Sequence, residues 1–296
     1  MPGQHYRDVH RTEYRYGAKM TDGYSVACVL SRPTPSQRVT SSVVTTDPEA
    51  DEYDERVDIF GNRVVQFGLH RPHDGLVVEA VTEAVVWEQE LPRVDVSWER
   101  VAATVDGLRG PMALDVSPFA APSRFVGVDA NRLALYDLAS SSFLPGRGIV
   151  DATMSFCSEI FGTFMFDPSF TELSTPLEVV LAERRGVCQD FAHLAVGGLR
   201  TLGLAARYVS GYIETDPPPG EPKSIGADAS HAWCSIWIPD HGWLDFDPTN
   251  GVVAPSRHVT IGWGRDYADV APVRGVVVGP SSEQSLSVSV DVTRKS

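Results

Sequence analysis

The chain has 296 residues, of which 43% are hydrophobic and 22% are charged, and its formal net charge is −14. This composition predicts a globular protein of one large domain or two ordinary ones, and it excludes the disordered and fibrous classes. The negative charge argues against nucleic acid and anionic membranes as partners. Because the N-terminus has no apolar signal segment and no apolar run approaches the ~20 residues of a membrane span, we expect a soluble, cytoplasmic protein.

Short segments rich in β-branched residues fill positions 5 to about 90, with Gly, Pro, Asn and Asp between them. They predict the strands of an N-terminal β-sandwich. The segments are YSVACVL, SQRVTSSVVTT, RVDIFG, NRVVQFGLH and LVVEAVTEAVVW, and the residues from Phe60 to Arg63 are typical of a tight turn. The pattern changes near residue 90, so we expect one domain at 1–90 and a second at 91–296.

Helical spacing of apolar residues replaces the strand pattern over residues 91–202. Ser97 is expected to cap a first helix, and residues 150–164 form an amphipathic one. The run Thr-Pro-Leu-Glu predicts another helix with Thr175 as its cap, and Gly186 is expected to end it.

The next helix begins at Cys188, with one apolar face. A helix N-terminus carries partial positive charge and unpaired N–H groups, which favour a thiolate and bind an oxyanion. Asp190 is expected to interact with the helix dipole, and His193 to be structural. Two glycines inside this helix, Gly197 and Gly198, are expected to pack against the strand that carries His231.

Three strands follow the helix, in AARYVSGYI, HAWCSIWI and WLDFDPT, and SLSVSVDVTR predicts a final strand. The second and third flank the short turn PDHG and predict a hairpin. A three-residue loop would pair Ile238 with Gly242 and place Asp247 diagonally opposite His231 on one face. Asp245 lies on that face too, but nearer the turn, and is the weaker candidate.

Cysteine acyl transfer needs a nucleophile, a base and a group that orients the base. Cys188 at a helix start, His231 on a strand and Asp247 on the next strand supply these in a fitting order. Each residue also has a structural alternative. A cysteine at a helix start is more often incidental, a histidine at a strand start is usually half-buried, and Asp-Pro-Thr-Asn is typical of a capped turn.

No metal or cofactor is expected. The cysteines are scattered, which argues against a disulfide framework and a Cys-rich zinc site. His70 and His73 lie in HRPHDG, which is typical of a turn, and no carboxylate pattern completes a metal site there. The phosphate-binding motifs G-x-G-x-x-G and G-x-x-x-x-G-K-[ST] are absent.

Long segments resemble the bacterial transglutaminase-like proteins, which share the papain-like cysteine-protease core. They are RGVCQDFAHL, LRTLGLAARYVSGY, GADASHAWCSIWIPDHGWLDFDPTN and GRDYADVAPVRGVVVG. Residues 6–87, with DIFGN, resemble the β-rich domain that precedes this core. The resemblance implies that Cys188 is the nucleophile, His231 the general acid/base and Asp247 the residue that orients the histidine. It implies a thioester formed with a glutamine side chain or a peptide carbonyl, and it requires no metal.

The predicted fold class is therefore α+β, with an N-terminal β-sandwich followed by a transglutaminase-like, papain-like cysteine core. The leading function is hydrolysis of an amide or peptide bond in a peptide or protein substrate. Amine transfer to glutamine and a catalytically idle binding module are the alternatives, and the oligomeric state stays open. Gln189 and Tyr208 are candidates by residue type for the second oxyanion donor or for substrate contact, and Trp233 for a wall of the site. The loop at 214–230 is expected to border the cleft.

Overall fold

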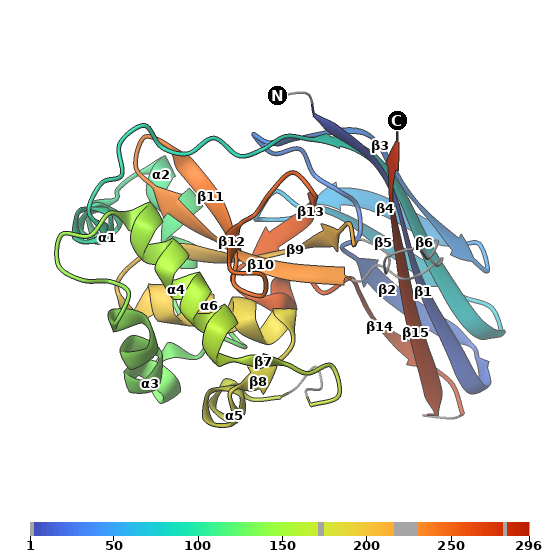
Figure 1. Cartoon of the computed structure of the whole chain (residues 1–296). Coiled ribbons are helices and arrows are strands. Elements are labelled where there is room, and N and C mark those ends of the chain that lie inside the picture. Colours follow the sequence, from blue (N-terminus) through green and yellow to red (C-terminus); the bar gives the residue numbers. More distant parts are fainter. Residues whose placement is uncertain (1–2, 171–174, 216–229, 281–282, 296) are drawn as a thin grey trace, which may run out of the picture.

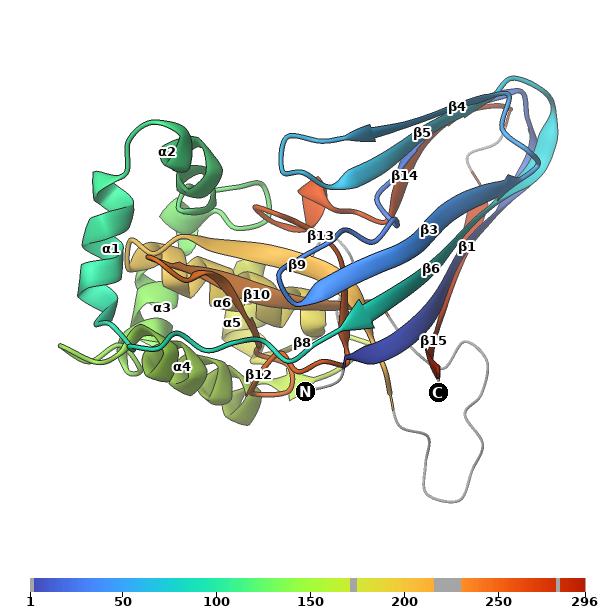
Figure 2. The same cartoon turned by 90° about the horizontal axis from the view of Figure 1, so that it is seen from above.

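The computed structural model describes residues 3–170, 175–215, 230–280 and 283–295. Its architecture is α+β. Two four-stranded antiparallel sheets lie at one end of the molecule, and a five-stranded sheet with its helices lies at the other (Figures 1 and 2).

The two four-stranded sheets form the predicted β-sandwich. One has the strand order β15-β1-β6-β3 and the other β14-β2-β5-β4. Their strands are β1 (Gln4–Met20), β2 (Asp22–Ala27), β3 (Gln37–Asp47), β4 (Glu52–Val57), β5 (Arg63–Leu69), β6 (His73–Val86), β14 (Val273–Val278) and β15 (Gln284–Lys295). Alternate apolar residues such as Val65, Phe67, Val78 and Ala80 are buried together between the sheets. The predicted turn is present between β4 and β5, where Gly61 has a φ of +78°.

The strand β1 has no apolar alternation in the sequence, although it is the longest in the sandwich. Its inward residues include Asp8, His10 and Thr12, which are all at most 2% exposed. They face the rest of the protein, since the His10 ring stacks on Tyr212 with centroids 5.6 Å apart. A polar buried face explains why periodicity alone does not reveal this strand.

Both ends of the chain belong to the sandwich (Figure 1). β14 pairs with β2, and β15 pairs with β1 along twelve residues from His5 to Tyr16. The C-terminal strands therefore pair with strands of residues 4–27 and not with the five-stranded sheet. The boundary at residue 90 stays a prediction.

The second part of the molecule holds the helices and the five-stranded sheet, whose order is β12-β11-β10-β9-β13. The helices are α1 (Trp98–Gly107), α2 (Pro111–Val116), α3 (Val128–Ser140), α4 (Ile149–Thr163), α5 (Leu177–Glu183) and α6 (Cys188–Thr201), with 3-10 turns η1 (Ser117–Phe119) and η2 (Tyr267–Asp269). The strands are β7 (Met165–Phe166), β8 (Arg185–Gly186), β9 (Ala206–Ile213), β10 (Ser230–Ile238), β11 (Gly242–Asp247), β12 (Val252–Val253) and β13 (His258–Gly264). Among the described helices, none is long and apolar enough to cross a membrane.

The ends of α5 differ from the prediction. The helix starts at Leu177 with Pro176 in the cap position, so Thr175 is not the cap. It ends three residues before Gly186, because Arg184 takes the left-handed conformation with a φ of 52°. Gly186 instead belongs to β8. The expected helix exists, but a non-glycine residue terminates it.

Helix α6 is buried on every side, and not on one face as predicted. Its residues from Asp190 to Thr201 are all buried between the five-stranded sheet and the helices α3 and α4. A β-carbon on Gly198 would lie 2.6 Å from the ring of Phe156 on α4. The two glycines of α6 therefore allow α3 and α4 to pack closely against it. The prediction that this pair packs against the His231 strand was wrong.

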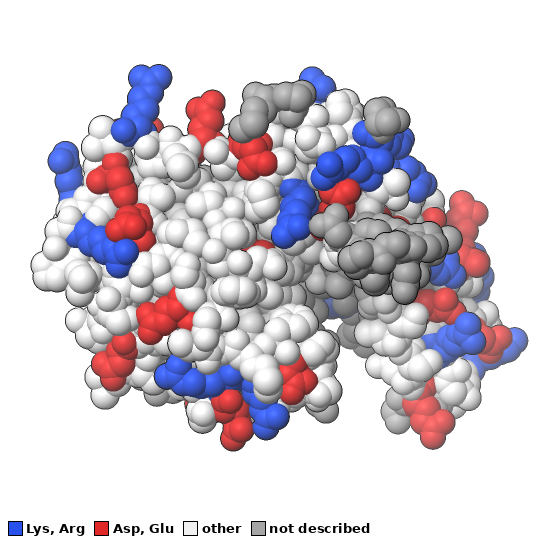
Figure 3. All heavy atoms as spheres, in the orientation of Figure 1, with Lys and Arg blue, Asp and Glu red and all other residues white. Residues whose placement is uncertain are grey.

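Charged side chains are interspersed on the face seen in Figure 3. Acidic and basic residues surround a largely uncharged area over the helices.

Candidate active site

Cys188 is the first residue of α6, the position predicted from the sequence. Val187 takes the cap position, and its backbone N–H donates to Oδ2 of Asp190 at 2.8 Å, which fixes the first turn. Of the four cysteines, all free, Cys188 alone is not fully buried. The thiol at the start of the helix is thus the most accessible one in the chain.

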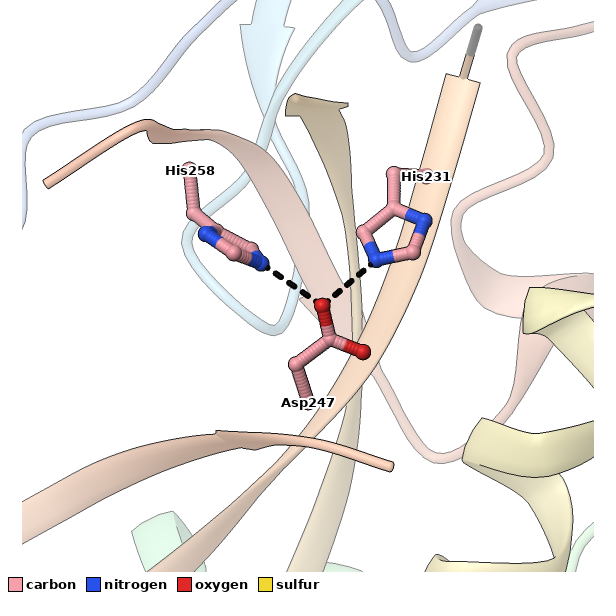
Figure 4. A group of neighbouring side chains, drawn as sticks. All are labelled: His231, Asp247 and His258. Atoms are coloured by element: carbon pink, nitrogen blue, oxygen red, sulfur yellow. Dashed lines mark hydrogen bonds and ion pairs between the residues drawn. The ribbon is translucent and has the colours of Figure 1, made fainter. Parts of the chain in front are cut away.

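The hairpin of β10 and β11 has the predicted register. Ile238 pairs with Gly242 and Cys234 with Phe246, so the loop has three residues. As a result His231 and Asp247 meet on one face of the sheet. Nε2 of His231 donates to Oδ2 of Asp247 at 2.8 Å (Figure 4). Asp245 is bound elsewhere, since its Oδ2 accepts the indole N–H of Trp233.

The thiol of Cys188 lies at the start of the His231 strand. Its Sγ donates to the carbonyl oxygen of Ser230, the residue before His231, at 4.0 Å. A hydrogen bond with Cys188 also acts on the imidazole. Because Asp247 takes Nε2, the ring nitrogen that remains for the thiol is Nδ1. The structure thus brings Cys188, His231 and Asp247 together in that order.

Electrostatics favour a charged pair inside this site. Burial lowers the pKa of His231, but the hydrogen bonds to Asp247 and Cys188 outweigh burial and raise it to about 10. Burial raises the pKa of Asp247, yet its two imidazole donors hold that pKa well below the usual range of a carboxyl. His231 is therefore an imidazolium and Asp247 a carboxylate at neutral pH.

Asp247 is also held by the chain that follows it. Oδ1 accepts the backbone N–H groups of Thr249 and Asn250 at 2.9 and 3.2 Å, and Oδ2 accepts the Asn250 side-chain amide at 2.6 Å. The Asp-Pro-Thr-Asn segment is thus a capped turn and the partner of the histidine at once, so the two interpretations of this motif do not compete.

A second histidine, absent from the sequence prediction, contacts the same carboxylate. His258 begins β13, and its Nε2 donates to Oδ2 of Asp247 at 2.8 Å (Figure 4). Its ring centroid lies 5.6 Å from that of His231. One signal was available: His258 starts a strand, and His231 is the second residue of another. The β10–β11 hairpin explains the contact of Asp247 with His231 but not its contact with His258.

Two imidazoles and a carboxylate are also a metal-ligand set. In the described part of the chain, His231, Asp247 and His258 form the group whose ligand atoms all lie within 4.8 Å of one another. A metal ion there would replace the hydrogen bonds that Oδ2 accepts and would take Nε2 of His231 from Asp247. In the structure both Nε2 atoms are hydrogen-bonded to Oδ2 of Asp247.

The other residues expected at the site lie close to it, and two of the three are buried. Trp233 is fully buried, packs its ring edge-on to His258 at 5.1 Å, and so has no surface for substrate. Tyr208 is 2% exposed, its ring lies 5.0 Å from that of His193, and the nearby Cys188 adds to burial in raising the pKa of its hydroxyl. Gln189, beside Cys188, is half-buried. In the loop expected to border the cleft, residues 216–229 lie outside the described residues.

Comparisons with known proteins agree with this arrangement. The profile of the transglutaminase-like superfamily matches residues 147–248, which include Cys188, His231 and Asp247. The profile of the bacterial transglutaminase-like N-terminal region matches residues 6–85. An uncharacterised protein of Mycobacterium tuberculosis is 38% identical, over 99% of this chain and 94% of its own. Another, of Mycobacterium leprae, is 30% identical over 97% and 98%.

The fold also has a solved counterpart. The crystal structure of a protein from Cytophaga hutchinsonii, named "putative cysteine protease", superposes with a TM-score of 0.75 at 22% identity, covering 99% of this chain and 91% of that one. At this identity the likeness shows a shared fold. Together with the two profile matches and the relatives that span the whole length, it establishes that the chain belongs to the transglutaminase-like superfamily, with the bacterial transglutaminase-like N-terminal region before its core.

Proposed function

We propose that this protein is a cysteine-dependent hydrolase of amide or peptide bonds that acts through a thioester. One observation carries the proposal. Cys188 begins a buried helix beside the strand of His231, whose imidazole is paired with Asp247 at 2.8 Å. An imidazolium stabilises a neighbouring thiolate, and the thiolate is the reactive form of cysteine.

In the first half of the reaction, the Cys188 thiolate attacks the carbonyl carbon, and the carbonyl electron pair moves onto oxygen. Unpaired N–H groups at the start of a helix such as α6 can donate to such an oxyanion. The oxyanion then collapses and the C–N bond breaks. Nδ1–H of His231 gives its proton to the departing nitrogen, so an amine or ammonia leaves and the acyl group stays on sulfur.

In the second half, neutral His231 takes a proton from water at Nδ1 while the water oxygen attacks the thioester carbon. Collapse breaks the C–S bond, releases a carboxylic acid and restores the thiolate beside the imidazolium. Asp247 stays ionised throughout and holds the ring so that Nδ1 faces sulfur. A peptide or protein supplies the amide in this proposal.

Amine transfer is the second candidate, because an amine in place of water would resolve the same thioester. A segment of 75 residues is 39% identical to the "Protein-glutamine gamma-glutamyltransferase" of Pseudomonas aeruginosa, but it covers 25% of this chain and 11% of that protein. Hydrolysis ranks first because it needs no second binding site beside the thioester.

Acylation by p-nitrophenyl acetate tests the proposal without knowledge of the native substrate. Wild type is expected to gain one acetyl group on Cys188, shown by peptide mass spectrometry, and to lose it with time. Cys188→Ala and His231→Gln are expected not to react at a comparable rate. Equal acetylation of wild type and His231→Gln would instead support an idle binding module. Adding a primary alkyl amine to the acetylated protein at neutral pH then separates transfer from hydrolysis by the product formed, with a small-molecule thioester as the control for uncatalysed reaction.

A further inference from the structure

His258 contacts Asp247 but has no role in the proposed reaction as written above. It lies on β13, which pairs with β9 and is not next to the β11 strand of Asp247. Even so its Nε2 lies 2.8 Å from Oδ2 of Asp247, the same oxygen and the same distance as Nε2 of His231. Figure 4 shows the two rings reaching this oxygen from opposite sides.

His258 cannot exchange protons with a substrate. It is 4% exposed, and its ring lies edge-on against the buried Trp233. Its other nitrogen, Nδ1, is buried and has no hydrogen-bond partner among the described residues. The imidazole therefore makes its one hydrogen bond to Asp247, and any effect on the reaction must pass through that carboxylate.

The ring also has a defined protonation state. Burial lowers the pKa of His258, and the nearby charges of His231 and Arg257 act in the same direction against the bond to Asp247. His258 is thus neutral at neutral pH and carries its proton on Nε2. A neutral donor fixes the carboxylate without placing a second positive charge beside the imidazolium of His231.

From this geometry we propose that His258 is a positioning residue, which holds Asp247 in the orientation that directs Nδ1 of His231 at Cys188. The proposal rests on the proposed function, since it assigns no separate reaction. It adds His258 to the group formed by Cys188, His231 and Asp247. In this group two imidazoles donate to one carboxylate oxygen. Second partners of this kind typically contribute 10- to 100-fold to activity where histidines bind metals, and we expect an effect of about that size.

Three substitutions separate a hydrogen-bond role from a packing role. His258→Phe keeps the ring against Trp233 but removes the donor. In His258→Gln the amide nitrogen lies about where Nε2 lies, so the donor is kept. In His258→Asn the amide is shorter and reaches only as far as Nδ1. His10→Phe is the matched control, because His10 is also buried against an aromatic ring but lies in the sandwich.

The readouts are the rate of Cys188 alkylation at pH 6, the rate of acetyl transfer from p-nitrophenyl acetate, and Tm. We expect the Phe and Asn variants to lose about 10- to 100-fold in both rates, with KM for the ester little changed. The Gln variant is expected to recover most of the loss, and His10→Phe to react like wild type. EDTA is expected to change none of these rates.

Several outcomes would overturn the proposal. Wild-type rates in His258→Phe, or equal rates in the Gln and Asn variants at equal Tm, would make His258 a packing residue. Loss of activity in EDTA would make it a metal ligand. If His258→Phe does not fold, the comparison of His258→Gln with His258→Asn still separates the hydrogen-bond role from the packing role. A wild-type Cys188 that alkylates no faster than an ordinary thiol would refute the proposed function itself, which is a separate result.

Discussion

Ile238 faces Gly242 across the β10–β11 hairpin, and this pair sets the register that brings Asp247 to His231. A slip by one residue would turn Asp247 to the opposite face of the sheet. In the observed register Asp245 lies on the same face, two residues nearer the turn, and binds Trp233 in place of the histidine. These two carboxylates form a matched pair for a test.

Asp247→Asn should leave the fold intact but slow acyl transfer by roughly 10⁴-fold, the size of effect seen when a triad loses its orienting carboxylate. The amide holds the imidazole less well and cannot balance its charge. Asp245→Asn should cost far less, because an amide oxygen still accepts from Trp233. The ratio of kcat/KM values, measured with one activated ester, checks this. The reverse ranking would show that Asp245 is the functional carboxylate.

This hairpin could be predicted because its determinants are local. The strands alternate, the loop is short, and the loop length fixes the register. The sandwich was predicted for the same reason, since its strands are short, β-branched and separated by turn residues. The N-terminal strand β1 was not predicted. Its buried positions hold the polar residues Asp8, His10 and Thr12, whereas hydrophobic periodicity expects apolar residues there.

His258 lay beyond prediction because its contact depends on how separate strands converge. β13 pairs with β9, yet its first side chain reaches a carboxylate on β11. The same holds for the C-terminal strand, whose alternation predicts a strand but not β1 as its partner. The end of α5 was misplaced because Arg184 adopts a conformation usually taken by glycine.

Cys188 should be alkylated selectively and at low pH. Burial raises the pKa of Cys28 to about 12, and a hydrogen bond to Cys157 together with burial raises that of Cys234. Cys188 is the one cysteine that is not fully buried, and the imidazolium of His231 beside it persists up to about pH 10. An ordinary thiol of pKa ~8.5 loses reactivity by roughly 75-fold from pH 8 to pH 6. For Cys188 we expect a much smaller loss.

Iodoacetamide labelling followed by peptide mass spectrometry measures these rates for each cysteine. His231→Gln is the control, and it should restore the steep pH dependence of an ordinary thiol at Cys188. Equal labelling of all four cysteines at pH 6 in the folded protein would contradict the ion pair.

Stability should fall at alkaline pH because of His231. Its pKa is about 10 in the folded protein and near its usual value of 6.5 in the unfolded chain. A raised folded pKa means that its contribution is fully present below about pH 6.5 and is lost as pH rises toward 10. One pKa unit corresponds to about 1.4 kcal/mol, so the difference between 6.5 and about 10 sets an upper limit of about 5 kcal/mol on the loss. Urea unfolding of wild type and His231→Gln at several pH values measures it. Parallel curves for the two proteins from pH 6 to pH 10 would show that the imidazolium adds no stability.

Gly211 should be essential for the shape of the site. It lies on β9 opposite His231 of β10 and Thr260 of β13. A β-carbon there would lie 2.2 Å from the carbonyl oxygen of Val259 and 2.4 Å from the ring of Trp233. Neither neighbour can yield easily, because one is backbone and the other is a fully buried ring. The side chain at this position must therefore be absent for β13 and Trp233 to approach β9.

Gly211→Ala should destabilise the fold by about 1–3 kcal/mol or more, as overpacking of a core does. It should also slow alkylation of Cys188, because Trp233 supports His258 and lies beside His231. Gly162→Ala is the control. Its β-carbon meets nothing within 4 Å at the exposed C-terminal end of α4, so it should be neutral or stabilising by up to about 1 kcal/mol. Urea unfolding and labelling at pH 6 report on both variants. If Gly211→Ala melts and reacts like Gly162→Ala, the close approach of these strands is not what shapes the site.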